Sequence, residues 1–198
     1  MAYELKPLTC NPGAITGMSE KIIVSHYENN YAGTVKRLNA IEQKLAELDW
    51  ATAPIFLVNG LKREQMVAMN SVLLHEAYFD SLGASQADSG LTDQFDKDFG
   101  GLDKWAAQFA AMGKALGGGS GWVLLVWSPH DGKLINAWAA DHTGNVAGAT
   151  PLLALDMYEH SYHMDFGAKA GAYVDAFMNN LSMAAASTKL AALIGDRS

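Results

Sequence analysis

The stretch DMYEHSYH, residues 156–163, is the part of the chain that best indicates its fold and function. Asp156 and His160 are four residues apart, so a helix that contained both would place their side chains on one side. A carboxylate together with neutral imidazoles suits iron, manganese or zinc. The spacing is common, however, and by itself fits better an amphipathic segment in which both side chains are solvated or pair locally. A metal site therefore requires further ligands elsewhere in the chain.

The overall composition is that of a globular protein, with 198 residues of which 49% are hydrophobic and 18% charged. The formal net charge of -7 argues against nucleic acid as a general partner, because phosphate binding requires a basic surface. The single cysteine, Cys10, excludes an intramolecular disulfide and a thiolate metal cluster. Because the N-terminus has no signal-peptide pattern and no apolar run could cross a bilayer, we expect a cytoplasmic protein without a membrane partner.

Two long helical patterns occupy the first part of the chain. Residues 5–17 contain prolines and glycines and predict an extended arm. Ser19 then stands where an N-cap is expected, and apolar residues recur every three or four positions as far as Asp49. After a connector around Pro54, a second helix is predicted over residues 63–82.

One histidine lies on the apolar stripe of each predicted helix, His26 on the first and His75 on the second. Helices joined by a modest connector tend to pack antiparallel, so the two side chains could face each other. A lone histidine on such a stripe is more often a hydrogen-bonded core residue than a ligand. The small polar stretch at residues 83–90 is the best candidate for a domain boundary.

In the second part of the chain, predicted helices come before and after a group of predicted strands. The order of these elements predicts an α+β fold, in which a long N-terminal helical hairpin (residues 1–86) precedes a metal-binding part (residues 87–198). In that part a small three-stranded antiparallel sheet is flanked by helices. The third strand runs into Asp156, and a strand end is a rigid place for a ligand. We expect helices at 92–99, 102–116, 172–180 and 183–193, and strands at 122–127, 133–140 and 150–155.

With these elements assigned, the chain resembles the iron/manganese superoxide dismutases over essentially its whole length. DMYEHSY at residues 156–162 resembles the D-x-W-E-H-A-Y signature of that family, and GSGW at residues 119–122 matches the start of its sheet. His26 lies in SHYENNY ahead of RLN at residues 37–39, and His75 precedes EAYFD, as the two helical histidines of the family do. Four positions in the right order make a far more specific match than any one of them.

The resemblance implies a metal centre and an activity. One iron or manganese ion per subunit would be held by His26, His75, Asp156 and His160, with a solvent molecule as a fifth ligand. The implied activity is the antioxidant dismutation of superoxide to oxygen and hydrogen peroxide, in which one superoxide reduces the oxidised ion and a second reoxidises the reduced one.

The resemblance also implies roles for residues around the metal. Glu159 and Tyr162 match positions at a dimer interface, where the glutamate would orient the ligand histidine of the other subunit, so we expect a homodimer or a dimer of dimers. Trp122 and Tyr78 match the aromatic wall that keeps the site dry. Without the resemblance, a solvated helix face would explain Glu159, and core packing would explain the two wall residues.

Several positions depart from the family pattern. The outer-sphere glutamine of the second helix is replaced by Ser71. The alternative glutamine or histidine after the sheet falls on Asp141 in an ungapped alignment and on His142 after a slip of one residue, and we expect His142 to take this role. The other departures are Asn30, Tyr31 and Thr34 for two histidines and an entrance tyrosine, Tyr158 for tryptophan, Ser161 for alanine, and residues 168–171 for a basic, proline-containing segment.

The sequence thus predicts a superoxide dismutase, with superoxide as its small-molecule substrate. One alternative keeps the metal but changes the redox reaction, because the smaller Thr34 would open the entrance to an organic substrate. Another is a non-enzymatic interaction scaffold. Zinc hydrolysis is a lesser option, since Glu159 would have to face the site as a general base.

Overall fold

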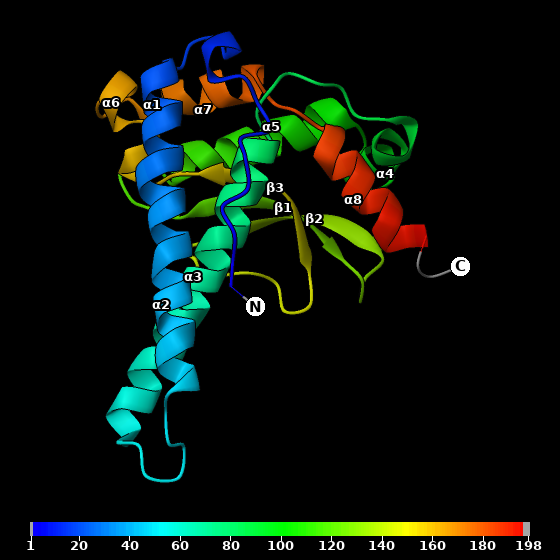
Figure 1. The fold of residues 1–198 in the computed structure, drawn as a ribbon. Helices are drawn as coiled ribbons and strands as arrows, with labels where there is room; N and C mark the ends of the chain where they lie inside the picture. Colours follow the sequence, from blue (N-terminus) through cyan, green and yellow to red (C-terminus); the bar gives the residue numbers. More distant parts are fainter. Residues whose placement is uncertain (1, 196–198) are drawn as a thin grey trace.

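In the computed structural model, which describes residues 2–195, a long helical hairpin projects from a body built on a small sheet (Figure 1). Ser19 caps the first helix as expected, its side-chain oxygen accepting a hydrogen bond from the amide of Ile22 at 3.2 Å. The two arms of the hairpin pack against each other. The first arm comprises α1 (Glu20–Ser25), a π-helical segment (His26–Tyr31) and α2 (Ala32–Ala46), and the second arm is α3 (Ile55–Asp80).

The hairpin differs from its prediction in three places. Its first arm is interrupted by the π-helical segment and ends at Ala46 rather than Asp49. Its second arm begins at Ile55, well before residue 63, with Pro54 at the N-cap, where no amide donor is needed. Ile55 and Phe56 are exposed, so the first turns of α3 lack the buried stripe on which a periodicity argument depends.

The body contains the remaining elements in the predicted order. Its strands are antiparallel in the order β2-β1-β3, which confirms the three-stranded sheet and the α+β class. The bounds are α4 (Ser89–Phe99), α5 (Leu102–Ala115), β1 (Trp122–Ser128), β2 (Lys133–Ala139), β3 (Thr150–Asp156), α6 (His163–Phe166), α7 (Ala170–Asn179) and α8 (Ala184–Gly195), with single 3-10 turns at Pro12–Ala14 and Glu159–Ser161. The division into two domains at residue 86 stays a prediction.

The sheet positions the end of β3 against the hairpin. Every residue of the central strand β1 is buried, because helices cover the sheet: α3 and α8 contact β3, α4 contacts β2, and α5 contacts β1. In the register of β1 and β3, Trp122 is paired with Asp156, the last residue of β3. Within residues 2–195, no helix combines the length and apolar character that a membrane span requires.

Candidate metal centre

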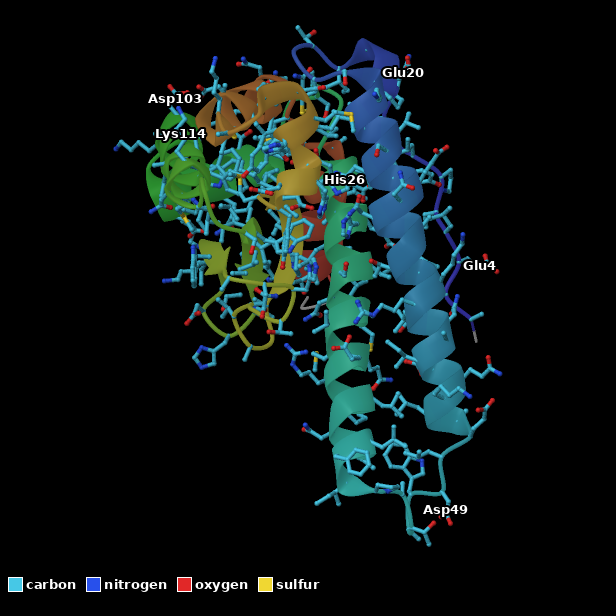
Figure 2. The ribbon with its side chains drawn as sticks, turned by 90° about the vertical axis from the view of Figure 1, so that its left-hand side faces the viewer. Glu4, Glu20, His26, Asp49, Asp103 and Lys114 are labelled. Atoms are coloured by element: carbon cyan, nitrogen blue, oxygen red, sulfur yellow. The ribbon has the colours of Figure 1, made fainter. Side chains whose placement is uncertain are left out.

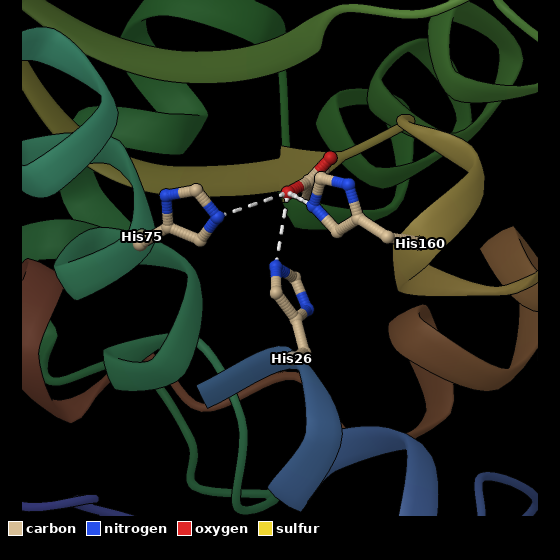
Figure 3. Close-up of side chains that lie close together, drawn as sticks. His26, His75 and His160 are labelled. Carbon is tan, nitrogen blue, oxygen red and sulfur yellow. Dashed lines mark hydrogen bonds and ion pairs between the residues drawn. The ribbon is translucent and has the colours of Figure 1, made fainter. Parts of the chain in front are cut away.

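Four side chains from three parts of the fold converge at the junction of hairpin and body. One ligand atom from each of His26, His75, Asp156 and His160 lies within 4.8 Å of the others. The Nε2 atoms of His26, His75 and His160 are 3.2, 3.7 and 3.2 Å from Oδ2 of Asp156. Figure 3 shows the three imidazoles directed at this carboxylate from different sides. The sequence thus identified all four groups that the fold brings together.

The four residues are positioned by different elements. His26 begins the π-helical segment at the end of the hairpin nearest the body, whereas Asp49 marks the opposite tip (Figure 2). His75 lies near the end of α3. Asp156 closes β3 and His160 lies in the 3-10 turn that follows, so the pair is not presented by one helix. A strand end followed by a tight turn achieves the same convergence.

Hydrogen bonds orient two of the ligands. The Nδ1 atom of His75 is 2.6 Å from the backbone carbonyl oxygen of Ser71, so it carries the proton and leaves the lone pair on Nε2. One oxygen of Asp156, Oδ1, accepts a hydrogen bond from the amide of Tyr158 at 2.8 Å, which leaves Oδ2 facing the imidazoles. Both ligands therefore present a lone pair to the same point.

The electrostatics favour neutral imidazoles beside an ionised carboxylate. Burial lowers the pKa of His26 and outweighs the nearby negative charge of Asp156. Burial and the neighbouring His26 lower the pKa of His75 from 6.5 to about 3. Burial opposes ionisation of Asp156, but the adjacent His160 and His26 outweigh it and hold the pKa of this carboxyl below its usual range. These are the protonation states that a metal ion requires of its ligands.

The residues fit a metal ion. The Nε2 atoms of His26 and His75 are buried and have no hydrogen-bond partner within residues 2–195, and a buried polar atom left in this way is costly unless something binds it. Three imidazoles and one carboxylate suit iron, manganese or zinc. His26, His75 and Asp156 are almost fully buried, whereas the side chain of His160 is 28% exposed.

An aromatic wall covers the side of the site formed by His26 and His75. The ring of Tyr78 lies 4.8 Å from that of His26, and the ring of Trp122 lies 5.4 Å from that of His75. Both wall residues are almost fully buried. Phe79, whose ring lies 5.2 Å from that of His26, belongs to the same wall.

His142, not Asp141, lies beside the centre. The indole nitrogen of Trp122 donates a hydrogen bond to Nδ1 of His142 at 2.9 Å, and the ring of His142 stacks on Tyr158 at 4.9 Å. Its ring is 6.2 Å from that of His75. Burial, partly offset by the charge of Asp156, lowers the pKa of His142. The exposed carboxylate of Asp141 instead accepts hydrogen bonds from Thr143.

Two departures from the family pattern contact each other. The hydroxyl oxygens of Thr34 and Ser71 are 3.3 Å apart, and that of Ser71 is 3.2 Å from Nδ1 of His75. Thr34 is therefore linked through Ser71 to Nδ1 of His75, the ring nitrogen opposite Nε2.

The two predicted interface residues lie in different environments. Glu159 is exposed, whereas Tyr162 is buried and stacks on Tyr173 at 5.3 Å. The hydroxyl of Tyr173 donates a hydrogen bond to the backbone oxygen of Asp156 at 2.8 Å and lies 3.4 Å from the hydroxyl of Tyr78. The sequence reasoning missed Tyr173, because an aromatic residue within an apolar helix carries no signal that separates it from ordinary core.

Comparisons with known proteins agree with this geometry. Residues 87–189 match the family model of the iron/manganese superoxide dismutases, C-terminal domain. An iron superoxide dismutase of Cupriavidus metallidurans is 63% identical over 99% of this chain and 100% of its own length. A manganese superoxide dismutase of Halobacterium salinarum is 33% identical over 88% of both chains, and an iron superoxide dismutase of Aquifex pyrophilus is 32% identical over 86% of this chain and 83% of its own. The chain belongs to the iron/manganese superoxide dismutase family.

Proposed function

We propose that this protein is a superoxide dismutase whose iron or manganese ion is held by His26, His75, Asp156 and His160. The observation that carries the proposal is the convergence of these four donor groups within 4.8 Å at a largely buried point. The relatives with iron and with manganese in their names support both metals, and the donor set suits either one.

When bound, such an ion supplies the redox chemistry by alternating between the +2 and +3 states while one superoxide leaves as oxygen and a second, with an electron and two protons, leaves as hydrogen peroxide. The chain holds the ligands in their metal-binding protonation states, because burial keeps His26 and His75 neutral. The single carboxylate, Asp156, offsets part of the positive charge of the ion. Trp122 and Tyr78 exclude water from the side of the ligands that they cover.

His142 is the residue that we propose to hold a proton close to the reaction. Because Trp122 donates to Nδ1, the neutral ring of His142 carries its own proton on Nε2 and has that N–H as its remaining donor. The lowered pKa keeps this ring neutral around pH 7. A neutral imidazole next to the ligands is able to donate a hydrogen bond without adding charge to the site.

The decisive experiment combines elemental analysis with a superoxide assay on the same purified, metal-loaded sample. We expect close to one iron or manganese ion per subunit and superoxide loss well above background. His160→Ala should remove both the metal and the activity, because it deletes a ligand at the open side of the site. His130→Ala is the matched control, since His130 lies in the β1–β2 turn with its side chain 94% exposed. Wild-type protein that binds iron or manganese but leaves superoxide untouched would refute the function.

A homodimer and a cytoplasmic location are also proposed. The exposed Glu159, one residue from the ligand His160, supports the first, because its carboxylate is free to meet a partner subunit beside the site. Sedimentation analysis of the wild type and of Glu159→Ala tests this: we expect a dimer that the substitution weakens, and a wild type that sediments as a monomer would refute it. The cytoplasmic location stays a prediction.

A further inference from the structure

Tyr31 packs on a metal ligand and is held from the other side by the N-terminal arm. Its ring stacks on that of His75, with centroids 6.2 Å apart and an angle of 23° between the planes. Its hydroxyl donates a hydrogen bond to Oε1 of Glu76 at 3.0 Å and accepts one from the amide of Lys6 at 3.1 Å. Burial raises the pKa of Tyr31 to about 12, so the phenol keeps the proton that it donates. One side chain thus links the arm to the face of His75.

The arm itself is fastened to the hairpin by further contacts around Lys6. The ammonium group of Lys6 pairs with Oε2 of Glu76 at 2.5 Å, and the carbonyl oxygen of Lys6 accepts a hydrogen bond from Tyr27 at 2.7 Å. At the outer end of the arm, Tyr3 exchanges two hydrogen bonds with Asn39, of 2.8 and 2.9 Å. The arm runs alongside the hairpin, where Glu4 marks its course (Figure 2).

The π-helical segment explains why one helix provides both a ligand and this contact. His26 and Tyr31 are the first and last residues of the segment. In a regular α-helix, residues five apart point to different sides, because each residue turns the helix by about 100°. The wider π turn, with its i to i+5 hydrogen bond, reduces that difference. His26 and Tyr31 can therefore both approach His75.

We propose that the N-terminal arm, residues 3–9, is a positioning element of the metal site that fixes the ring of His75 through Tyr31 and Glu76. This inference rests on the proposed function, because it takes His75 as a ligand. Glu76 follows His75 directly in α3, so the Lys6 and Tyr31 contacts hold the helix at the ligand itself. Partners of ligands commonly change metal affinity by about 10- to 100-fold.

The test compares two substitutions that each remove two hydrogen bonds, of which one involves the arm in Tyr31→Phe and both involve it in Asn39→Ala. Tyr31→Phe keeps the ring on His75 but loses the bonds to Glu76 and to Lys6, whereas Asn39→Ala loses both bonds to Tyr3, at the outer end of the arm. Metal-loaded protein is mixed with excess chelator, the rate of metal loss is followed, and the melting temperature of each metal-free protein is measured alongside. We expect Tyr31→Phe to lose metal about tenfold faster than the wild type, and the rate of metal loss from Asn39→Ala to stay within about twofold of the wild-type rate. Both metal-free variants should have a lower melting temperature than the metal-free wild type.

Two results would overturn this inference but leave the proposed function standing. One is that Tyr31→Phe loses metal at the wild-type rate. The other is that both variants lose metal equally fast, which would mean that the arm contributes only to general stability. Should Tyr31→Phe not fold, Glu76→Gln takes its place. It keeps an acceptor for Tyr31 but breaks the ion pair with Lys6, and we expect metal loss about threefold faster than the wild type, with an unchanged rate counting against the inference. A wild type that holds no iron or manganese would remove both this inference and the proposed function. A wild type that holds metal without activity would refute only the function.

Discussion

The helical half of the metal centre, His26 and His75, and its sheet half, Asp156 and His160, are held in place in different ways. The sheet half depends on its own neighbourhood: β3 pairs with β1, the amide of Tyr158 binds the carboxylate of Asp156, and His160 follows in the next short turn. The helical half comes from two arms of the hairpin that meet only in the folded protein. Its supports are separated in sequence by as much as the 70 residues between Lys6 and Glu76.

The two halves of the metal site are therefore held in place by different kinds of interaction. The sheet half is fixed by backbone pairing, which tolerates side-chain changes as long as the strands form. The helical half is fixed by buried side chains, whose protonation and packing decide where the imidazoles point.

The largest loss of stability is expected from Gly121→Ala, which disrupts the backbone contacts that hold the sheet half in place. The carbonyl oxygen of Gly121 accepts a hydrogen bond from the amide of Met157 at 2.9 Å, directly after Asp156. Its φ of +136° is strained for other residues, and a Cβ atom would lie 2.2 Å from the carbonyl oxygen of Ala139. We expect the free energy of unfolding, measured by denaturant titration, to fall by about 4 kcal/mol or more.

Gly60→Ala in α3 is the matched control for that substitution. A Cβ atom at Gly60 would meet nothing within 4 Å, and replacing a helical glycine by alanine stabilises a helix by roughly 0.5–1 kcal/mol. A loss of stability in this control, or none in Gly121→Ala, would contradict the view that the backbone at the end of the sheet is the constrained part.

The next effect concerns the helical half and appears as the pH dependence of stability in the metal-free protein. His75 has an ordinary pKa of 6.5 that is lowered to about 3 in the fold, and the pKa of His26 is lowered as well. Below pH 6.5 the unfolded chain therefore binds protons that the folded chain excludes. The free energy of unfolding decreases as the pH is lowered, by up to about 1.4 kcal/mol per pH unit for each histidine. The lowered pKa of Asp156 adds a further loss below its usual 3.8.

Denaturant titrations of metal-free protein between pH 7 and 5 measure this slope. His75→Gln should reduce it by the contribution of one histidine, because glutamine does not titrate. A stability that stays constant over this range would show that the two buried imidazoles take up protons in the folded protein, and would contradict a helical half that is held by neutral histidines.

The smallest effect is expected at His142, whose ring lies near that of His75 and stacks on Tyr158 without belonging to either half. His142→Ala should retain the metal and lower the superoxide activity by about tenfold or more, corresponding to about 1.4 kcal/mol, because the N–H donor beside the ligands is lost. Asp141→Asn, whose carboxylate is turned to Thr143, should stay within about twofold of the wild type. Equal losses in both variants, measured together with the metal content, would contradict the assignment to His142.

Much of the fold and the ligand set follows from local patterns. The strands, the glycine breaks and the Ser19 cap each depend on a few neighbouring residues, so the sheet, most helix positions and the α+β class were predicted correctly. The start of α3 at Ile55 was not, because the exposed apolar residues there do not form a one-sided stripe. The π-helical segment that begins at His26 was missed as well, since the periodicity on both sides of it is that of an ordinary helix.

The sequence by itself determined which four residues would be proposed as ligands and which family the chain resembles, because the order and spacing of their motifs are properties of the chain alone. The tertiary structure decided what surrounds those ligands: His142 rather than Asp141 beside the centre, Ser71 between Thr34 and His75, and Tyr31 between His75 and the arm. Such contacts join residues far apart in the chain. They exist only once burial has excluded water and fixed the packing of the hairpin against the sheet.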